Sequence, residues 1–345
     1  MNENPWPPEG LERVERCPIC GNQARSVLHQ GLDDQVFFCA PGVWTQYRCR
    51  VCGSAYLDPR PTRESIHLAY SSYYTHSAPT MTALPAVLSR RFRMALGYLN
   101  VRYNCAFKEA DRLGYLLALL TPLRGARQDR SVRHLRRPAG SARLLDVGCG
   151  NGEFLAWMRL AGWEVEGIDP DPQAVASARS AGLSVQEGTL AEVPFPEGSF
   201  EAITLSHVIE HLHDPSDALR ACFHALKPGG TLWIATPNLA AQGHREFGKR
   251  WLHLDPPRHL ILFTPRSLRA LLRPEGFQVA ARPKPSYSTE WTYQASAAIA
   301  NGHDPINSPP PLPAPLKRKA RLAEWRAYLR PQVAEEIVLL ARKPL

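Results

Sequence analysis

The sequence predicts an α/β fold, a mostly parallel sheet with helices on both faces, that follows a small cysteine-paired module. From Ser141 onward, short apolar runs alternate with helical segments, which is the pattern of parallel strands joined by crossover helices. A glycine-rich turn at 148–152 directly follows the first of these apolar runs. Two paired-cysteine turns lie within the first 60 residues. Together these features indicate two parts of the chain: a small N-terminal module stabilised by paired cysteines, and a larger α/β domain built on a parallel sheet.

The chain divides by composition into three parts. Residues 1–60 form the cysteine-paired module, and residues 61–138 form a helical connector in which apolar residues recur every three or four positions, notably over 88–120. Residues 139–345 carry the sheet, interrupted by a proline-rich insertion at 283–331 that we expect to be partly irregular. Within this insertion, residues 315–329 have the pattern of a basic amphipathic helix.

The sheet is predicted to have seven strands, and the last of them is reached only after the long insertion. The strands are expected at 143–147, 164–168, 184–187, 202–206, 231–236, 277–281 and 336–342. The helices between them are expected at 152–161, 172–181, 215–226 and 265–272.

The composition is that of an ordinary globular protein, with 44% hydrophobic and 21% charged residues in 345. The polar, proline-rich start has no signal-peptide pattern, and the best apolar run, 113–123, is too short to span a bilayer. We therefore expect a soluble, cytoplasmic protein with no membrane span. The formal net charge is +9, and thirteen Arg and Lys lie from Arg90 to Arg143. Such a basic stripe can bind nucleic acid or anionic substrates, but a solvated helix face and linker explains it more simply.

The turn after the first strand has the spacing of a cofactor-binding turn. Glycines at 148, 150 and 152 allow the chain to bend sharply and let its backbone approach a ligand closely. The spacing is G-x-G-x-G rather than the G-x-G-x-x-G that places a pyrophosphate at a helix N-terminus. S-adenosylmethionine has no pyrophosphate and presents an amino acid and a sulfonium instead. Asp146, at the strand end, can accept hydrogen bonds from the cofactor's amino group and complements its positive charge.

Two later strand ends complete the predicted cofactor site. Asp169 follows the second strand, about twenty residues after the glycines, where a carboxylate can accept hydrogen bonds from both ribose hydroxyls. The stretch 187–190 closes the third strand where the adenine would lie. The predicted cofactor-binding residues are Asp146, Gly148, Cys149, Gly150, Asp169, Pro170, Gly188, Thr189, Leu190 and Ser206.

These motifs resemble those of class I S-adenosylmethionine-dependent methyltransferases over about residues 141–282, from LLDVGCGNG through GID to LKPGGTLWIATPN. The resemblance implies a Rossmann-like, seven-stranded sheet with an antiparallel last strand, and S-adenosyl-L-methionine as the methyl donor. One departure is Thr189, where the family usually carries an aspartate for the adenine amino group; a backbone contact from Thr189 or Leu190 can replace it. The other interpretation is a Rossmann-like domain that binds a nucleotide without methyl transfer, and four ordered motifs argue against it.

Two C-x-x-C-G turns place Cys17, Cys20, Cys49 and Cys52 as metal ligands. Each turn points two thiolates at one place, so together they predict a tetrahedral Zn²⁺ site with no open position and a structural role. Iron bound as in a rubredoxin and four free thiols are the alternatives. The stretch, with its tail at 56–61, resembles the N-terminal zinc-binding module that precedes certain bacterial methyltransferases. That resemblance implies a module that packs on the catalytic domain or gathers substrate, with nucleic-acid binding as the rival role.

The candidate catalytic residues follow the fourth strand. In the stretch S-H-V-I-E-H, His207, Glu210 and His211 would share one face of a helix at the mouth of the cofactor site. The stretch resembles the E-x-x-E-H signature of ubiquinone-pathway O-methyltransferases and small-RNA 2′-O-methyltransferases, in which two Glu and a His bind a divalent metal. Here His207 replaces the first Glu, and His259 is the further His downstream. An imidazole in place of a carboxylate would favour Zn²⁺, Mn²⁺ or Fe²⁺ over Mg²⁺.

Other roles for this stretch stay open. His207 or His211 could act as a general base with Glu210 orienting the ring, or the polar residues could satisfy local backbone groups. Thr236 and Asn238 end the fifth strand at the pocket rim and could touch substrate. Four weaker substrate-wall candidates are better explained by ordinary packing: Tyr73, Tyr74, Trp251 and Arg258.

The sequence thus predicts transfer of a methyl group from S-adenosylmethionine to an oxygen of a small-molecule biosynthetic intermediate, such as a sugar, a lipid-linked precursor or a phenol. The first alternative is an RNA methyltransferase that uses the basic stripe and the zinc module. The second is a non-catalytic adaptor that only retains the cofactor fold, and the intact Asp146 and Asp169 argue against it.

Overall fold

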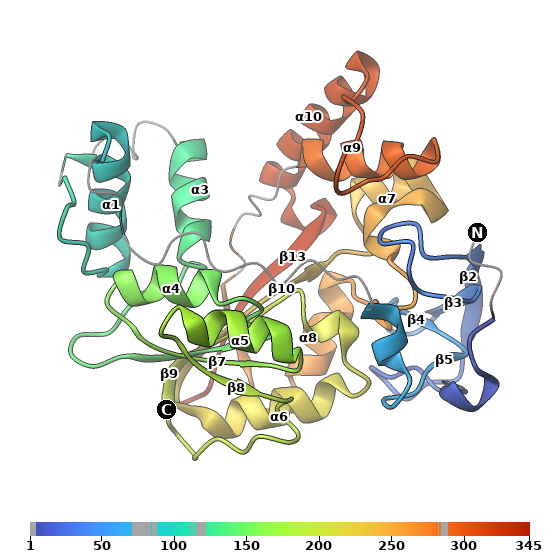
Figure 1. The fold of residues 1–345 in the computed structure, drawn as a ribbon, viewed down its shortest axis with the longest axis horizontal. Helices are drawn as coiled ribbons and strands as arrows, with labels where there is room; N and C mark the ends of the chain where they lie inside the picture. The colour runs from blue at the N-terminus through green and yellow to red at the C-terminus, as the bar shows by residue number, and fades with distance from the viewer. Residues whose placement is uncertain are drawn as a thin grey trace.

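The computed structural model describes residues 5–70, 84, 88–111, 113–114, 122–281, 283 and 289–345. Figure 1 shows the main sheet with its helices, the small strand module at one side, and the helix pair α9 and α10 above. The weaker candidates Tyr73 and Tyr74 lie outside the described residues. In the described part of the chain, no helix has both the length and the apolar character needed to cross a bilayer.

The prediction of a seven-stranded sheet is confirmed, with the strand order β12-β13-β10-β9-β6-β7-β8. The strand that is last in the sequence, β13, lies between β10 and β12 and runs antiparallel to both, whereas β10, β9, β6, β7 and β8 pair in parallel. The carboxyl ends of the parallel strands therefore meet at one edge, where such sheets bind ligands. The strands are β6 (Arg143–Val147), β7 (Glu164–Asp169), β8 (Ser184–Glu187), β9 (Phe200–Ser206), β10 (Leu226–Pro237), β12 (Gln278–Ala281) and β13 (Glu336–Arg342).

Alternating side chains along these strands build two cores, one on each face of the sheet. Leu144 belongs to one core and its neighbour Leu145 to the other, as the period of two in a strand requires. Helices α4 and α5 supply the first core, and α6 and α8 supply the second. Three of these helices begin with a proline behind an Asp or Thr N-cap that fixes their starts. Their bounds are α4 (Glu153–Leu160), α5 (Pro172–Ser180), α6 (Pro215–Ala225) and α8 (Pro265–Leu272).

The cysteine-paired module is joined to the main domain by strand pairing. Its sheet has the order β11-β4-β3-β2, and β11 comes from the chain between β10 and α8. In this pairing Ile261 lies opposite Tyr56, only two residues after the candidate ligand His259. The strands are β2 (Arg25–Leu32), β3 (Trp44–Cys49), β4 (Ala55–Leu57) and β11 (Ile261–Leu262), with a separate pair, β1 (Leu11–Glu12) and β5 (Arg60–Pro61).

Helices make up much of the connector and the insertion. The connector holds α1 (Arg90–Tyr103), which ends at a left-handed Asn104, and α3 (Pro122–Ser131). The prediction of a helix over 315–329 is confirmed by α10 (Ala314–Leu329), and the structure adds α9 (Thr289–Ala300). Helix α9 lacks a polar stripe because most of its residues are buried, and it packs against α10 and α7 (Gln242–Phe247). Short 3₁₀ turns lie at Pro8–Gly10, Ile66–Tyr70, Ile209–His211, Gly248–Arg250, Leu252–Leu254 and Pro331–Val333.

Candidate active site and metal centres

The glycine turn after β6 lies at the carboxyl edge of the sheet. Gly148, Gly150 and Gly152 all have a positive φ, at 67°, 53° and 83°. A Cβ atom on Gly148 would lie 2.4 Å from Val208 Cγ2, and one on Gly152 would lie 2.4 Å from Leu183 Cδ1. The positive φ therefore favours glycine at all three positions, and a side chain at 148 or 152 would in addition have to displace a neighbouring side chain.

Asp169, at the end of β7, is hydrogen-bonded to this turn. Its Oδ2 accepts from the Gly150 amide at 2.7 Å, and its Oδ1 accepts from the Asp171 amide at 3.0 Å. The side chain is buried, and burial raises the pKa of Asp169 in spite of these donors. The carboxylate is thus held in one place beside the turn, which is the arrangement that a bidentate contact to a ribose diol needs.

Asp146 is engaged by Arg133, a residue that the sequence analysis placed in the basic stripe rather than in the site. Arg133 forms an ion pair with Asp146 and donates to Thr204 Oγ1 at 2.7 Å, and Thr204 donates in turn to Asp146 Oδ1 at 2.7 Å. Burial raises the pKa of Asp146 and lowers that of Arg133, so each of the two charges depends on the other. Because both contacts use Oδ1, the expected bond to the cofactor's amino group falls to Oδ2.

The other predicted cofactor residues lie at the ends of neighbouring strands. The Thr189 amide and its Oγ1 both donate to Glu192 Oε2, each at 2.8 Å. The side chain, the amide and the carbonyl of Thr189 are therefore all engaged locally, which leaves the expected adenine contact to Leu190. Gly188 has a φ of 127° at the end of β8. Cys149 follows β6 and is buried, and Pro170 follows β7 and is exposed. Ser206 is the last residue of β9 and is half-buried.

The four predicted zinc ligands meet at one point. The Sγ atoms of Cys17 and Cys52 are 3.5 Å apart, those of Cys20 and Cys49 are 3.6 Å apart, and all four lie within 4.8 Å of one another. A tetrahedral Zn–S distance of about 2.3 Å corresponds to an S–S edge of about 3.8 Å, so the cluster fits the ion. Ser54 Oγ, 3.0 Å from Cys52 Sγ, can donate a hydrogen bond to a thiolate ligand.

Glu210, His211 and His259 form a second group that could hold a metal ion, with ligand atoms within 4.8 Å of one another. The Nδ1 atom of His211 lies 3.0 Å from the Arg258 carbonyl oxygen, and that of His259 lies 2.8 Å from the His253 carbonyl oxygen. When Nδ1 donates to a carbonyl, Nε2 is left as the nitrogen available to a ligand. Burial, followed by the proximity of His259, lowers the pKa of His211 to about 4, which keeps its ring neutral.

The carboxylate of Glu210 fits the same interpretation. The side chain is fully buried, and its Oε2 accepts from Thr236 Oγ1 at 2.9 Å. Its Oε1 has no hydrogen-bond partner in the described part of the chain. This oxygen makes a longer ion-pair contact of 3.3 Å with His207 Nδ1, and the carboxylate and the two oriented imidazoles still form a donor set that suits a divalent ion.

His207 lies beside this group rather than within it. The stretch after β9 does not open a regular helix: it forms one 3₁₀ turn, Ile209–His211, and His207 precedes the turn with a φ of 54°. Its Nε2 lies 2.6 Å from Glu336 Oε1, and its Nδ1 makes a longer ion-pair contact, 3.3 Å, with Glu210 Oε1. Burial alone would lower the pKa of His207, but the two carboxylates raise it to about 10. Both ring nitrogens of His207 thus face carboxylates, so in this structure His207 bridges Glu210 and Glu336 and lies outside the group formed by Glu210, His211 and His259.

Glu336 is a buried residue of this network that the sequence analysis missed. It lies on β13, and Arg130 of the connector donates to its two oxygens at 2.6 and 3.2 Å. Burial would raise the pKa of Glu336, but His207 and Arg130 hold it at about 2. The sequence feature that could have indicated a buried charge here is the carboxylate of Glu336 directly before the apolar run of the final strand.

The two strand-end residues Thr236 and Asn238 are both fully buried. Asn238 Nδ2 donates to the Gln332 and Ala334 carbonyls, at 3.0 and 2.7 Å. The expectation that Asn238 touches substrate is therefore wrong, because its amide is consumed in joining β10 to the chain before β13. Thr236 instead holds Glu210.

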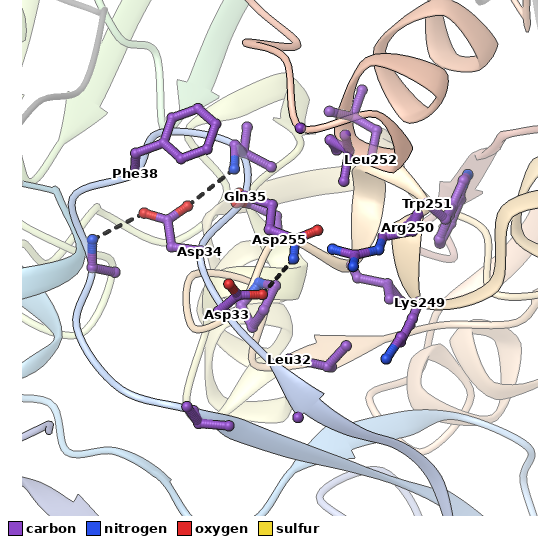
Figure 2. A pocket seen from close by; sticks show the side chains of 18 of the residues that line it. Leu32, Asp33, Asp34, Gln35, Phe38, Lys249, Arg250, Trp251, Leu252 and Asp255 are labelled. Carbon is purple, nitrogen blue, oxygen red and sulfur yellow. Dashed lines mark hydrogen bonds between the residues drawn. The ribbon is translucent and has the colours of Figure 1, made fainter. Parts of the chain in front are cut away.

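A cavity of about 600 Å³ lies between the cysteine module and the segment 249–256 (Figure 2). Asp33 and Gln35, in the loop after β2, line it from the module, and Arg250 and Asp255 line it from the main domain. Figure 2 shows Asp33 and Gln35, joined by a hydrogen bond, facing Arg250 across the cavity. Asp255 Oδ2 also lies 3.9 Å from His259 Nε2, so this wall is shared with the second metal-capable group.

Comparisons with known proteins agree with this geometry. Residues 115–282 match a family model for a methyltransferase domain. The ubiquinone biosynthesis O-methyltransferase of Xanthomonas axonopodis pv. citri (strain 306) is 37% identical over 159 residues, which cover 41% of this chain and 64% of that protein. The chain carries a class I S-adenosylmethionine-dependent methyltransferase domain. Six of the seven strands of its sheet, the glycine turn and Asp169 lie within the matched residues, and β13 lies beyond them.

Further relatives match the same methyltransferase domain. The ubiquinone biosynthesis O-methyltransferase of Xanthomonas oryzae pv. oryzae (strain PXO99A) is 42% identical over 113 residues, covering 30% of this chain and 46% of that protein. The chain thus spans less than two thirds of the length of these relatives. A solved S-adenosylmethionine-dependent methyltransferase from Mesorhizobium loti aligns with 64% of this chain and 99% of that chain, at 20% identity and a TM-score of 0.42.

Proposed function

We propose that this protein transfers a methyl group from S-adenosylmethionine to an oxygen of a small molecule held at Glu210, His211 and His259. The observation that carries the proposal is this second metal-capable group, which follows the carboxyl end of β9 in the methyltransferase domain. A divalent ion bound there would draw acceptor oxygens to one place and favour their deprotonated form. The relatives that are named ubiquinone biosynthesis O-methyltransferases support oxygen as the methylated atom.

The chain's own residues would bind and align the two reactants. Asp169 would hold the ribose and Asp146 the amino group of the donor, while Arg133 keeps Asp146 charged. Methyl transfer is a direct displacement, so most of the rate enhancement comes from alignment of acceptor, methyl group and sulfur. We further propose that the four-cysteine site holds structural zinc, since its thiols fit a closed tetrahedron.

Two observations favour a small-molecule acceptor over RNA. The cavity beside Asp255 has a volume of about 600 Å³, within the range of small-ligand sites. Two cations of the basic stripe, Arg130 and Arg133, are committed to internal ion pairs with Glu336 and Asp146 and are not available to phosphates. We propose that the acceptor enters this cavity, so the zinc module supplies one wall of its site.

A methyl-transfer assay tests the proposal. The probe is 3,4-dihydroxybenzoate, whose adjacent oxygens can both bind one ion, with S-adenosylmethionine and Mn²⁺ or Zn²⁺ supplied. We expect S-adenosylhomocysteine and an O-methylated catechol as products, and calorimetric binding of S-adenosylhomocysteine to the free protein. Absence of cofactor binding would sink the methyltransferase proposal, and cofactor binding without catechol methylation would reject the phenolic acceptor.

The Asp169→Ala variant should bind S-adenosylhomocysteine between about tenfold and a hundredfold more weakly, because hydrogen bonds to a charged group contribute about 1.5–3 kcal/mol. The change also removes the acceptor for the Gly150 amide, so part of the loss comes from a looser turn. Titration calorimetry measures the effect. The matched control is Asp171→Asn, two residues away, which keeps an N-cap for α5 and should leave the affinity within about twofold. Equal losses in both variants would contradict the assignment of the ribose to Asp169.

The Glu210→Gln variant should lose one bound metal ion while the cofactor affinity stays unchanged. An amide keeps the shape of the side chain and the bond from Thr236 but removes the negative charge that a divalent ion requires. We expect the metal content to fall from about two ions per chain to about one, and methyl transfer to fall about a hundredfold or more, which is about 2.7 kcal/mol. The control is Glu197→Gln, an exposed carboxylate away from both predicted sites. Unchanged metal content in Glu210→Gln would leave general-base catalysis as the role of this cluster.

A further inference from the structure

The outer face of α10 carries apolar side chains that nothing in the described part of the chain covers. Leu322, Trp325 and Leu329 are 46%, 60% and 58% exposed. Their spacing of three and four places them on one side of the helix. The opposite side packs on the domain through the fully or nearly buried Ala320 and Ala323. Figure 1 shows α10 at the end of the molecule away from α6, with its outer part projecting from the body.

Basic residues accompany this apolar stripe. Arg318 lies one turn before Leu322, and Arg321 and Arg326 flank the stripe; all three are exposed or half-buried at the surface. No carboxylate in the described residues lies within 4 Å of Arg318 or Arg326. By contrast, Lys317 is paired with Glu290 of α9 and Lys319 with Glu246 of α7. Arg321 makes a longer contact of 4.0 Å with Glu290. The single acid of the helix, Glu324, falls about 130° from the centre of the stripe at 3.6 residues per turn. The outer face is therefore apolar in the middle and positive at its margins.

We propose that α10 docks the protein on an anionic lipid surface. Leu322, Trp325 and Leu329 would enter the interface between headgroups and acyl chains, where the amphipathic indole of tryptophan is favoured. Arg318 and Arg326 would keep their aliphatic stems on the apolar layer and their guanidinium groups among acidic headgroups. The helix would lie in the plane of the surface and would not cross it.

Two physical arguments favour a lipid surface over a second copy of the chain. Three apolar side chains fall well short of the roughly 800 Å² per partner that a stable protein interface buries. A two-fold contact would also bring the same positive margins together, and like charges across an interface oppose association. An acidic lipid surface matches both the apolar centre and the positive margins.

Co-sedimentation of the full chain with vesicles tests the proposal. The vesicles contain phosphatidylcholine alone, or phosphatidylcholine with phosphatidylglycerol as about a third of the lipid. We expect binding only to the anionic vesicles, and weaker binding as salt increases. Paired substitution Trp325→Ser and Leu329→Ser should weaken binding by about tenfold or more, because the buried apolar area is lost.

The charge arm has a matched control. We expect binding to fall by about fivefold or more for each arginine in the double variant Arg318→Glu and Arg326→Glu. The control is the double variant Arg91→Glu and Arg93→Glu on α1, which has the same change in net charge and should bind nearly as well as the unsubstituted chain. Equal effects of the two pairs would mean that net charge alone drives binding, and would overturn the proposal. Failure of the unsubstituted chain to bind would do the same. Size-exclusion chromatography with light scattering adds one more arm: a dimer that the Trp325 and Leu329 substitutions dissociate would assign this face to a second copy instead.

Discussion

The Cys17→Ser variant should release the metal of the four-cysteine site and loosen the whole N-terminal module. Structural zinc sites contribute about 10–16 kcal/mol to the folding of small domains, and serine does not replace a thiolate ligand. The effect should extend beyond the module, because β4 lies between β3, which ends at Cys49, and β11 of the methyltransferase domain. We therefore expect faster hydrogen exchange at Ile261 and Leu262, and a weaker second metal site, since His259 precedes β11 by only two residues.

Metal analysis and hydrogen exchange followed by mass spectrometry measure this effect. The matched control is Cys39→Ser, because Cys39 is half-buried in the same module but outside the group of four. It should keep the metal and the exchange pattern of the unsubstituted chain. Retention of the metal by Cys17→Ser would rule out the four-cysteine site, and loss of the metal without faster exchange in β11 would show that the strand pairing survives without it.

The sequence was informative where local patterns decide the structure. Strand alternation at Leu144 and Leu145 sorts side chains between two cores, and three of the predicted strands match the observed bounds residue for residue. The glycine turn was equally readable, because Gly148 and Gly152 meet steric demands that only glycine satisfies. The four cysteines were placed together correctly, since two C-x-x-C turns have few other ways to arrange their thiols.

Contacts between residues distant in the chain could not be read in this way. Arg133 and Glu336 lie in segments that look like a basic linker and an apolar strand, and only the fold brings them to Asp146 and His207. The expected helix face at 207–211 assumed regular spacing, whereas a left-handed His207 turns its ring toward Glu336 instead. Strand β11 has two residues, too few for any periodic signal.

The Arg258→Ala variant should be strongly destabilised, because Arg258 is the charge at the centre of a fully buried junction. It is 0% exposed and forms ion pairs with Asp34 of the cysteine module and Asp255 of the main domain. Its Nη1 also donates to the Ala69 carbonyl at 2.8 Å. Burial alone would raise the pKa of Asp34, but Arg258 and backbone donors hold it at about 2. Without the arginine the buried carboxylate is either left charged without compensation or takes up a proton, and both outcomes lower the stability of the fold.

Removal of one partner from a buried ion pair costs about 3–5 kcal/mol, because the other charge is left without compensation. For a domain of this size we expect the midpoint of thermal unfolding to fall by roughly 10 °C, measured by calorimetry. The control Arg250→Ala removes a half-buried arginine from the same segment; no carboxylate in the described residues lies within 4 Å of it, and the change should stay within about 0.5 kcal/mol.

The combination of Arg258→Met with Asp34→Asn distinguishes the charge from the packing of this junction. Methionine fills much of the volume of the arginine stem. Asparagine removes one unpaired charge and keeps one oxygen for the Cys39 and Ala40 amides, but its NH2 group then replaces the oxygen that accepts from the Val36 and Phe37 amides. If Arg258→Ala is destabilised because buried carboxylates lose their positive partner, the double variant should be more stable than Arg258→Met alone, although it carries one more substitution. If the double variant is no more stable than Arg258→Met alone, the junction depends on the hydrogen bonds of the planar guanidinium group. That group joins Asp34 of the cysteine module, Asp255 of the main domain and the Ala69 carbonyl.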